Sequence, residues 1–475
     1  MRILIWHGWL LEGSGSNVAA AKLAEVLRRA GHEVLLVCQE PNADRFGFVD
    51  ATGTVDADSV SLPTASGPSH EGRVVLLRPD IGSLLSVFVI DEYEGFEVKR
   101  FVDLTDLELA SYLDRNVEAL RTAAEWWEPE VAFAGHAVPG AVVARRALGQ
   151  GRYVAKIHGS DLEYAVRLQQ RYADLAREGL EGARAVVGGT RDVLDRAMEF
   201  VPQIAGRTRP VPPGVDVDRF YPRPRRDALL DVAGKLDADP ETARGRPEAL
   251  DNEVHEAGDD PSALDALAHR YDQSVPDPAA ASKLRSLASY DGSLVGYFGK
   301  LIPQKGVELL IRAIPEVGRP LRCLIAGFGL YREHLTALVR SLGLTDEVTF
   351  TGRLDHRYAP QALAALDVSV VPSVLVEAFG IVAAEAAAAG ALPLVARHSG
   401  LAEVAGVLEG AVGRPRLFSF DPEPERAVSN VAAGIRRLLD LPRDERRGLR
   451  RSVADFVASN WTWDRYVELL LEAAR

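Results

Sequence analysis

The sequence predicts an α/β protein with two doubly wound parallel sheets, and three observations support this prediction. Short apolar runs alternate with helical stretches from Ile3 onward, fade after residue 222 and start again at Ser293. Strands that alternate with helices are typical of a parallel sheet with helices on both faces. The chain has 475 residues, which is too long for one ordinary hydrophobic core. We therefore expect two domains of about 200 residues each, with material left for a linker or insertion.

Composition and charge narrow the class of protein. No segment approaches the length of uninterrupted apolar sequence that crosses a membrane, and the N-terminus enters a strand without a signal-peptide pattern, so we expect a cytoplasmic protein. The formal charge of −13 argues against a general nucleic-acid binder. Contact with a membrane surface through a local patch is still compatible with this charge. Cys38 and Cys323 lie in apolar strand patterns, which predicts buried reduced thiols rather than a disulfide or a metal pair.

The N-terminal segment predicts a strand, a loop and a helix. Residues 3–6 are apolar, a Gly/Ser-rich loop follows, and an Ala/Leu periodicity continues to Arg29. We expect Ser16 or Asn17 to cap this helix. A dinucleotide cofactor is disfavoured because Val18 stands where the third glycine of G-x-G-x-x-G would be.

The Gly/Ser loop is itself a candidate ligand site. Two glycines close together allow a nest of backbone N–H groups that approaches a phosphate or a hydroxylated ligand closely. A plain turn between strand and helix is the alternative. The residues concerned are Gly13, Ser14, Gly15 and Ser16.

Further elements extend the first domain. Strand-like segments are predicted at residues 34–38, 74–77, 84–90, 131–134 and 153–157, and helices at residues 106–127 and 139–148. Residues 41–72 are rich in Asp, Ser, Pro, Gly and Thr and are predicted to form a long surface loop.

Two histidines follow strand-like segments of this domain. His136 comes directly after Gly135, and His158 follows Ile157 and precedes another glycine. Ligands of open α/β sheets bind beyond the carboxyl ends of the strands, so a histidine there can contact a substrate. A core or capping histidine is the alternative for both positions.

Residues 223–290 differ in composition from the segments on either side. Asp, Glu, Ala, Pro and Arg dominate, and large apolar residues are few. We expect a variable insertion or linker with short helices that carries much of the negative charge.

The second half of the chain begins with a candidate phosphate site. Gly299 and Lys300 end an apolar strand, and Lys305 follows five residues later as a helix begins. Two ammonium groups near a helix N-terminus attract a diphosphate through simple electrostatics. Two solvent-exposed lysines are the alternative.

A pair of glutamates follows a later strand. The strand meets Pro372 and Ser373, both poor residues in a helix interior, and a run of helix formers begins near Ala378. Glu377 is therefore expected in the loop or at the helix start, where unpaired N–H groups attract an anion. Glu385 is expected about 12 Å further along the helix, so that the two carboxylates bracket a nucleotide sugar. A helix-start carboxylate plus a solvent-facing glutamate is the alternative.

This arrangement resembles a known family. A Pro-Ser segment, Glu377, Phe379-Gly380 and a second glutamate after seven intervening residues are similar to the Glu-x7-Glu signature of retaining glycosyltransferases of the GT-B fold, family four in particular. The resemblance covers nearly the whole chain apart from residues 41–72 and 223–290. It implies two Rossmann-like domains that face each other across a cleft.

The resemblance implies a role for each matching residue. In the family the first glutamate contacts the donor sugar and diphosphate and the second holds the ribose hydroxyls, which are Glu377 and Glu385 here. Lys300 stands where the family has arginine, so bidentate phosphate geometry is lost. The implied catalytic residues are His158, Lys300, Lys305 and Glu377. The implied donor contacts are Gly299, Gly327, Gly329, Gly352, Arg353, Phe379, Gly380 and Glu385, and the implied acceptor or phosphate contacts are Gly13, Ser14, Gly15, Ser16 and His136.

The resemblance also implies a reaction and a domain order. We expect retaining transfer of a hexosyl group from a nucleotide sugar to a hydroxyl acceptor, with no cofactor, no metal and no nucleic-acid partner; a homodimer stays open. The sequence has no Asp-x-Asp motif at a strand end and no His/Cys cluster with ligand spacing. The expected domains are residues 1–222 for the acceptor, 223–290 for the insertion, 291–460 for the donor and 461–475 for a helix that crosses back to the first domain.

Two other classes remain as alternatives. A nicotinamide-dependent oxidoreductase would use Glu40 at the end of the second strand as a ribose ligand, but both halves of the chain lack G-x-G-x-x-G. A catalytically silent sugar-nucleotide-binding or scaffold protein is favoured slightly by Lys300 in place of arginine.

Overall fold

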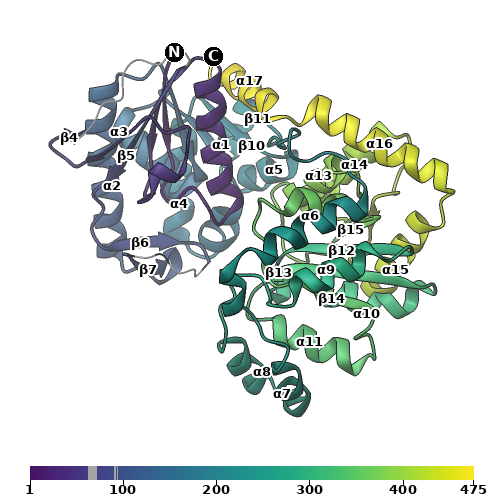
Figure 1. The fold of residues 1–475 in the computed structure, drawn as a ribbon. Coiled ribbons are helices and arrows are strands. Elements are labelled where there is room, and N and C mark those ends of the chain that lie inside the picture. Colours follow the sequence, from purple (N-terminus) through teal and green to yellow (C-terminus); the bar gives the residue numbers. More distant parts are fainter. Residues whose placement is uncertain (63–71, 90–92, 94) are drawn as a thin grey trace. The chain divides into compact units, whose positions relative to one another are not determined.

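The chain divides into two compact units in the computed structural model, which describes residues 1–62, 72–89, 93 and 95–475. Unit 1 comprises Met1–Gly214 together with Trp463–Arg475, and unit 2 comprises Val215–Thr462. The first boundary therefore lies after Gly214 rather than after residue 222, and the terminal segment of unit 1 begins at Trp463 rather than at residue 461. Figure 1 shows each unit as a sheet covered by helices, which confirms the predicted α/β class.

The main sheet of unit 1 has the strand order β11-β10-β9-β8-β1-β2-β5-β3-β4. All neighbouring pairs are parallel except β3 and β4. The strands are β1 (Arg2–Trp6), β2 (Glu33–Val37), β3 (Ala51–Val55), β4 (Val60–Ser61), β5 (Arg73–Pro79), β8 (Val131–Gly135), β9 (Val154–Ile157), β10 (Ala185–Gly188) and β11 (Thr208–Pro210). A separate parallel pair is formed by β6 (Leu84–Val87) and β7 (Glu97–Arg100).

Helices cover the main sheet of unit 1 (Figure 1). They are α1 (Gly15–Arg29), α2 (Asp106–Trp127), α3 (Val142–Leu148), α4 (Gln170–Gly182), α5 (Arg191–Phe200) and α17 (Trp463–Ala473), with short turns η1 (Ala43–Arg45), η2 (Phe101–Asp103), η3 (His136–Ala141), η4 (Leu162–Val166) and η5 (Pro202–Arg207). The C-terminal helix α17 packs on α1, and its Tyr466, Val467 and Leu470 share a buried apolar cluster with Leu23 and Leu27. The last helix of the chain thus completes the core of the N-terminal unit.

The predicted surface loop at residues 41–72 is wrong in part. The structure has η1, β3 and β4 there; β3 pairs in parallel with β5, and its residues Ala51 and Val55 are buried. Residues 63–71 lie outside the described residues. The strand predicted at residues 84–90 is observed as β6, and its predicted last residue, Ile90, also lies outside the described residues.

The start of α1 also differs from the prediction. Ser14 is the N-cap, and its Oγ accepts a hydrogen bond from the N–H of Asn17 at 3.3 Å. The observed cap therefore lies two residues before Ser16, the first of the two predicted cap residues. Sequence could not decide between Ser14, Ser16 and Asn17, because each is a good N-cap.

Unit 2 contains a fully parallel sheet in the order β14-β13-β12-β15-β16-β17. The strands are β12 (Ser293–Lys300), β13 (Leu321–Phe328), β14 (Val348–Phe350), β15 (Val368–Val371), β16 (Leu392–Ala396) and β17 (Ser419–Phe420). Because all strands run the same way, every carboxyl end lies at one edge of the sheet. We call this edge, with the loops that leave it, the donor edge, after the role that the resemblance implies for it.

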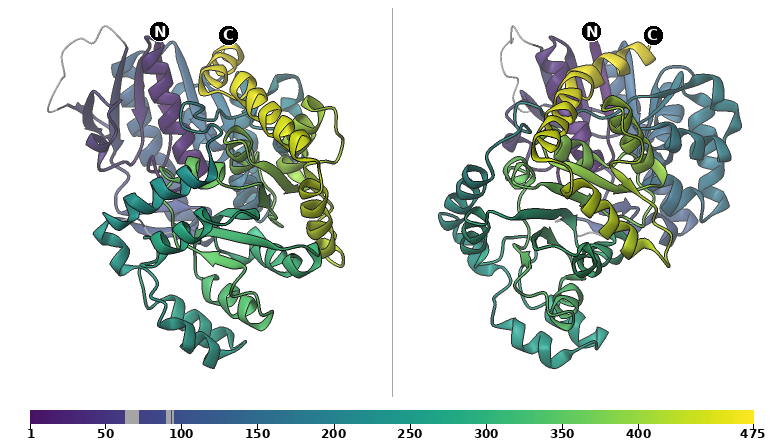
Figure 2. Two further views of the ribbon diagram at one scale, coloured as in Figure 1. Left: turned by 45° about the vertical axis from the view of Figure 1, so that its right-hand side comes forward. Right: turned by 90° about the vertical axis from the view of Figure 1, so that its right-hand side faces the viewer.

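Helices flank both faces of this sheet (Figures 1 and 2). They are α6 (Arg225–Asp237), α7 (Leu250–Ala257), α8 (Pro261–Ala268), α9 (Ala280–Ala288), α10 (Val307–Val317), α11 (Arg332–Ser341), α12 (Ala359–Ala364), α13 (Ile381–Ala388), α14 (Ser399–Ala411), α15 (Ala427–Leu439) and α16 (Arg443–Asn460), with η6 (Pro240–Arg244) and η7 (Pro303–Lys305). Helix α13 packs against α16.

The segment 223–290 is more than a linker. Helices α6 and α9 pack on each other, and their buried residues, among them Leu229, Val232 and Leu284, belong to the main core of unit 2. The part between them, with α7 and α8, packs against α11 through a smaller apolar cluster that contains Leu250, Leu264 and Ala337. The few large apolar residues of this segment are thus concentrated on the faces that meet the rest of unit 2.

Candidate functional site

The donor edge of unit 2 collects most of the residues that the sequence singles out. Lys300 ends β12, Phe328 ends β13 and precedes Gly329, and the Gly352-Arg353 pair follows β14. The loop with Glu377 follows β15 and precedes α13. Their common placement follows from the parallel order of the strands.

Lys305 and Glu377 form an ion pair across two of these loops. The Nζ atom of Lys305 lies 2.5 Å from Oε1 of Glu377, and both side chains are largely shielded from solvent. Partial burial makes such a pair stronger than an exposed one. The two loops are also joined by backbone hydrogen bonds, because the N–H groups of Val374 and Leu375 donate to the carbonyl of Gln304.

The main chain of Glu377 is fixed by the loop after β16. Its N–H donates to Oγ of Ser399 at 3.0 Å, and its carbonyl accepts from the N–H of Gly400 at 2.9 Å. His398 reinforces the same region, since its Nε2 lies 2.6 Å from the carbonyl oxygen of Ser373. Sequence reasoning missed Ser399 and His398 as positioning residues, although both follow a buried strand directly.

The helix after Glu377 begins later than the sequence suggests. Gly380 is the N-cap with φ +87°, and α13 starts at Ile381. Glu377 is therefore a loop residue, and the spacing of about 12 Å that was predicted from continuous helix does not apply. The ring of Phe379 is buried against Trp461 at 5.3 Å between centroids, so only its main chain is free to face a ligand.

Glu385 lies inside α13 and is held by a histidine that the sequence analysis did not select. Its side chain is only 8% exposed, and Oε1 lies 2.8 Å from Nε2 of His356. Burial alone would lower the pKa of His356, but the hydrogen bond and negative charge of Glu385 outweigh it and raise that pKa. A signal for His356 was its position shortly after β14, in the loop that also carries Arg353.

Lys300 and Arg353 approach one aromatic ring. The Lys300 ammonium lies 5.9 Å, and the Arg353 guanidinium carbon 4.8 Å, from the centroid of Phe328. Cations over a ring face are attracted by its quadrupole. The donor edge thus carries these two cations beside Phe328, in addition to Lys305.

The glycines of the donor edge are required by close backbone contacts. A Cβ on Gly327 would lie 2.1 Å from the carbonyl oxygen of Gly299, and Gly327 donates to the carbonyl of Gly352 at 2.9 Å. Gly352 has φ +70°, and a Cβ there would lie 2.4 Å from a carboxylate oxygen of Asp277. The predicted donor contacts Gly299, Gly327, Gly329 and Gly352 therefore also hold the loops together.

Part of the segment 223–290 lies directly against the donor edge. The N–H of Asp277 donates to the carbonyl of Thr351 at 2.8 Å, and Pro276 forms a β-bridge with Gly352.

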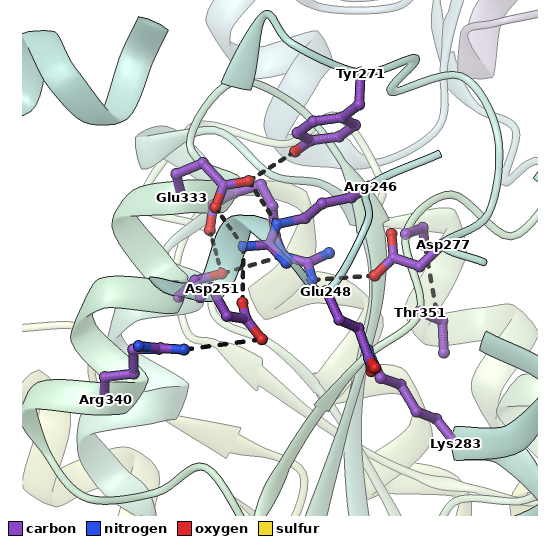
Figure 3. A network of polar contacts seen from close by, with 12 residues as sticks. Arg246, Glu248, Asp251, Tyr271, Asp277, Lys283, Glu333, Arg340 and Thr351 are labelled. Atoms are coloured by element: carbon purple, nitrogen blue, oxygen red, sulfur yellow. Dashed lines mark hydrogen bonds and ion pairs between the residues drawn. The ribbon is translucent and has the colours of Figure 1, made fainter. Parts of the chain in front are cut away.

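Figure 3 shows the ion-pair network that holds this segment in place. Arg246 makes two hydrogen bonds to Glu333, at 2.7 and 2.8 Å, and both side chains are almost fully buried. Tyr271 donates to the same carboxylate at 3.0 Å.

Unit 1 presents a different cluster, in which three adjacent strands are each followed directly by a histidine. His7 follows β1, His136 follows β8, and His158 follows β9. The rings of His136 and His158 lie 4.6 Å apart between centroids, and Trp9 lies 4.7 Å from His136. We call these three residues the histidine cluster; the sequence analysis selected His136 and His158 but missed His7.

Burial keeps the histidine cluster uncharged. It lowers the pKa of His7 to about 4 and lowers the pKa values of His136 and His158 well below the ordinary range. Neighbouring positive charge, including that of Lys156, adds to the effect. Burial also lowers the pKa of Lys156 to about 8. A neutral imidazole both donates and accepts hydrogen bonds, which suits a hydroxyl group.

A buried carboxyl lies beneath the cluster. Asp161 is fully buried, and its Oδ2 accepts a hydrogen bond from the N–H of Ala137 at 2.5 Å. Burial raises the pKa of Asp161 to about 6, although backbone N–H groups, that of Ala137 first, oppose this shift. Asp161 thus fixes the main chain directly after His136.

The N-terminal loop is attached to the same cluster. The side chain of Asn17 contacts Nε2 of His7 at 3.0 Å and donates to the carbonyl of Glu12. Glu40 accepts hydrogen bonds from the N–H groups of Leu11 and Asn42, both at 3.1 Å, so its carboxylate holds loops rather than standing free for a ribose. Gly13, Ser14 and Gly15 are exposed and Ser16 is half-buried.

Two further properties concern the described residues only. They contain no group of three or more His, Cys, Asp or Glu side chains placed to hold a metal ion. None of the helices in the described ranges combines the length and apolar character needed to cross a bilayer. Cys38 and Cys323 are buried free thiols, as the sequence predicts.

Solved structures identify the architecture as the GT-B fold of two Rossmann-like units. A sucrose-phosphate synthase from Thermosynechococcus elongatus superimposes with a TM-score of 0.63 at 19% identity, over 99% of this chain and 97% of its own. The Anabaena HepE protein, solved with UDP and glucose, gives a TM-score of 0.60 at 16% identity, over 99% of this chain and 98% of its own.

Two family models match successive parts of the chain. Residues 283–451 match the model for glycosyl transferases group 1, and residues 13–219 match the model for glycosyltransferase family 4. The chain belongs to the family 4, or group 1, glycosyltransferases.

The curated relatives that the chain resembles are glycosyltransferases with different named substrates. A GDP-mannose-dependent alpha-(1-6)-phosphatidylinositol monomannoside mannosyltransferase from Mycobacterium tuberculosis is 30% identical over 43% of this chain and 53% of its own length. A D-inositol 3-phosphate glycosyltransferase from Rhodococcus erythropolis is 32% identical over 47% of this chain and 50% of its own length. The chain thus spans about half the length of these relatives.

Proposed function

We propose that this protein transfers a hexosyl group from a nucleotide sugar to a hydroxyl acceptor, with retention of the anomeric configuration and without a metal ion. The observation that carries the proposal is the Lys305–Glu377 pair at the donor edge, where an ammonium and a carboxylate lie 2.5 Å apart. A diphosphate needs the first group and sugar hydroxyls suit the second. Membership of the family supports the reaction class. The sequence-based expectation of a cytoplasmic location is part of the proposal.

The cations of the donor edge would stabilise the leaving group. An ammonium has three N–H donors, so Lys305 retains donors for phosphate oxygens while it contacts Glu377. Lys300 and Arg353 add positive charge beside Phe328. Charge that develops on the diphosphate as the glycosidic bond breaks would be stabilised by these fixed groups.

Glu385 and His356 would hold the nucleoside part of the donor. A carboxylate has about four acceptor positions, so the contact with His356 leaves room for the two ribose hydroxyls. Burial of Glu385 removes competing water and fixes its direction.

The acceptor would be activated by the departing diphosphate itself. The bond from the anomeric carbon to the phosphate oxygen breaks, the bond to the acceptor oxygen forms on the same face, and the acceptor proton passes to the phosphate. Glu377 would orient the sugar and His158 would position hydroxyls. The low pKa of the half-buried His158 supports this positioning role, because a neutral imidazole hydrogen-bonds a hydroxyl without adding charge.

The test is an assay of transfer and of stereochemistry. The protein is incubated with UDP-, GDP-, ADP- and TDP-hexoses and a panel of hydroxyl acceptors, with and without EDTA. We expect one nucleotide family to give a product with the anomeric configuration of the donor, at equal rates in both conditions. An inverted product contradicts the retaining mechanism, and a loss of rate with EDTA contradicts metal independence. Donor binding without hydrolysis or transfer to any acceptor would instead support the silent binding protein.

A further inference from the structure

A large cavity lies in unit 2 at the end of the sheet opposite to the donor edge. Its volume is about 1330 Å³, and its lining includes Ser293, the first residue of β12, and Asp367, which directly precedes β15. Lys300 is at the other end of β12, which is roughly 23 Å away at about 3.3 Å per residue. The cavity is therefore separate from the site described above.

Arginine dominates the lining of this cavity. The acidic residues in the lining are Asp291 and Asp367. The arginines are Arg223, Arg225, Arg226, Arg319, Arg443, Arg446, Arg447, Arg450 and Arg451. This concentration of positive charge occurs in a chain whose formal net charge is −13, so it is not a consequence of overall composition.

The floor of the cavity carries positive charge that its acidic partner does not cancel. Arg225 and Arg450 share the carboxylate of Asp367, with contacts of 2.5 and 3.3 Å, and that carboxylate also accepts from the N–H of Leu294 at 3.0 Å. Two guanidinium groups thus face one carboxylate. Burial lowers the pKa of Arg450, and the nearby charges of Arg225 and Arg446 act in the same direction against the opposing effect of Asp367.

The rim of the cavity offers cations that are not engaged elsewhere. The side chains of Arg226, Arg443 and Arg451 are exposed and have no ion-pair or hydrogen-bond partner among the residues that the structure describes. Arg226 and Arg443 belong to the first turns of α6 and α16, whose N-caps, Pro224 and Pro442, provide no side-chain hydrogen bond. The positive ends of two helices therefore add to the field of the arginines.

We propose that this arginine cavity binds a phosphate-bearing anion, either as a free small molecule or as the headgroup of a lipid. The planar guanidinium fork matches phosphate oxygens in a bidentate manner, which a lysine ammonium does not. The concave shape and the volume suit a phosphate-bearing molecule rather than a single surface ion.

Helix α13 connects this cavity with the donor edge. It begins after Gly380 beside the Glu377 loop, carries Glu385, and is followed by Gly390, whose carbonyl accepts a hydrogen bond from Nε of Arg450. An anion that draws the Arg450 guanidinium would act on the C-terminal end of the helix that positions Glu385. Occupancy of the arginine cavity is therefore expected to change donor affinity.

The first experiment measures the binding of inorganic pyrophosphate by titration calorimetry. Because the donor edge itself can bind pyrophosphate, the measurement is made on the full-length Lys305→Ala variant. In that background we expect Arg226→Glu, Arg443→Glu and Arg451→Glu together to weaken pyrophosphate binding at least tenfold. The matched control, Arg121→Glu with Arg152→Glu and Arg426→Glu, changes the net charge equally at exposed arginines outside the cavity and should have less than a threefold effect.

Several outcomes would overturn the proposal. One is unchanged pyrophosphate affinity in the cavity variant, and another is an equal loss in the control variant, which would indicate general electrostatics only. If the triple variant does not fold, as judged by its thermal unfolding midpoint, Arg451→Glu alone serves in its place, with Arg426→Glu as its control.

A second experiment distinguishes the two sources of phosphate. Sedimentation with phosphatidylcholine vesicles, with and without about one third phosphatidylglycerol, measures lipid binding. Binding to the anionic vesicles that is lost in the cavity variant and is displaced by pyrophosphate indicates a lipid headgroup. Pyrophosphate binding without vesicle binding indicates a free anion. Absence of both kinds of binding contradicts the proposal.

Discussion

The donor edge of unit 2 and the histidine cluster of unit 1 occupy corresponding places, the carboxyl ends of parallel strands, but differ in charge. The donor edge holds charged groups in pairs, such as Lys305 with Glu377. In the histidine cluster His7 and His136 are buried and His158 is half-buried, and all three have lowered pKa values, so they are neutral at pH 7. The carboxyl ends of parallel strands thus supply a charged environment in unit 2 and a neutral one in unit 1.

This difference matches two different tasks. A diphosphate that leaves with increasing negative charge needs fixed cations, which the donor edge supplies. A hydroxyl acceptor needs hydrogen bonds of both senses without competing charge, which neutral imidazoles supply. The proposed reaction requires both tasks, and the four predictions below test whether they are divided between the units in this way.

The largest effect is expected from Lys305→Ala. The change removes a cation from the donor edge and leaves Glu377 without its partner, so transfer should slow about 100- to 1000-fold. The measurement is kcat for sugar transfer. Lys235→Ala is the matched control, because Lys235 pairs with Asp231 on an exposed face of α6. A rate within threefold of wild type for Lys305→Ala would remove the donor edge from the chemistry.

The next largest effect is expected from His158→Ala. Loss of a hydroxyl-positioning imidazole should lower kcat about 100-fold while the donor dissociation constant stays within twofold, because the change is confined to unit 1. Steady-state kinetics and donor titration measure the two quantities. If His158→Ala weakened donor binding and left kcat unchanged, His158 would act in donor binding, which contradicts the proposed division of tasks.

The sequence predicts the charged residues of the donor edge better than the neutral histidine cluster. Lys300, Lys305 and Glu377 follow strands, and parallel strands bring such residues to one edge whatever the details. His7 was missed although it follows β1 as His136 and His158 follow their strands, but the contact between the three depends on β1, β8 and β9 being neighbours in the folded sheet. Nothing in local sequence reports that adjacency.

The contacts that fix the donor edge were also hidden in the sequence. His356 and Glu385 are 29 residues apart, and their hydrogen bond depends on how the β14 loop packs on α13. Asp277 reaches Thr351 from a segment that composition alone suggests is a linker. Gly380 stops α13 from starting at Ala378 through its positive φ, which the helix-forming residues around it do not reveal.

Glu385→Ala should weaken donor binding by about tenfold, a smaller effect than the two changes of rate. The change removes the proposed acceptor of ribose hydrogen bonds, and a net loss of about 1.5 kcal/mol, the low end for one bond to a charged group, corresponds to about tenfold. Titration of the nucleotide measures it. Glu403→Ala, on α14, is the comparison, since it removes a glutamate from a neighbouring helix of the same unit. Equal affinities in Glu385→Ala and wild type would exclude the ribose role.

The smallest effect concerns pH. The pKa of His356 is raised, so the protonated form is favoured by the folded state, and its contribution to stability is complete below about pH 6.5 and is lost as the pH rises through the folded value. Deprotonation of His356 also removes the charged partner that holds Glu385, so donor affinity should fall two- to threefold between pH 6 and pH 9. His356→Gln should flatten this profile, and a profile identical to wild type would exclude His356 as its source.

The most direct measurement of the central claim is thermal unfolding with nucleotide sugars in wild type, Glu385→Ala and His158→Ala. A donor at about 100 times its dissociation constant stabilises the protein by roughly 2.7 kcal/mol, which raises the unfolding midpoint measurably. The account predicts that one nucleotide family raises the midpoint in wild type and in His158→Ala, and that the shift is reduced in Glu385→Ala. A shift that is lost in His158→Ala and retained in Glu385→Ala would contradict it.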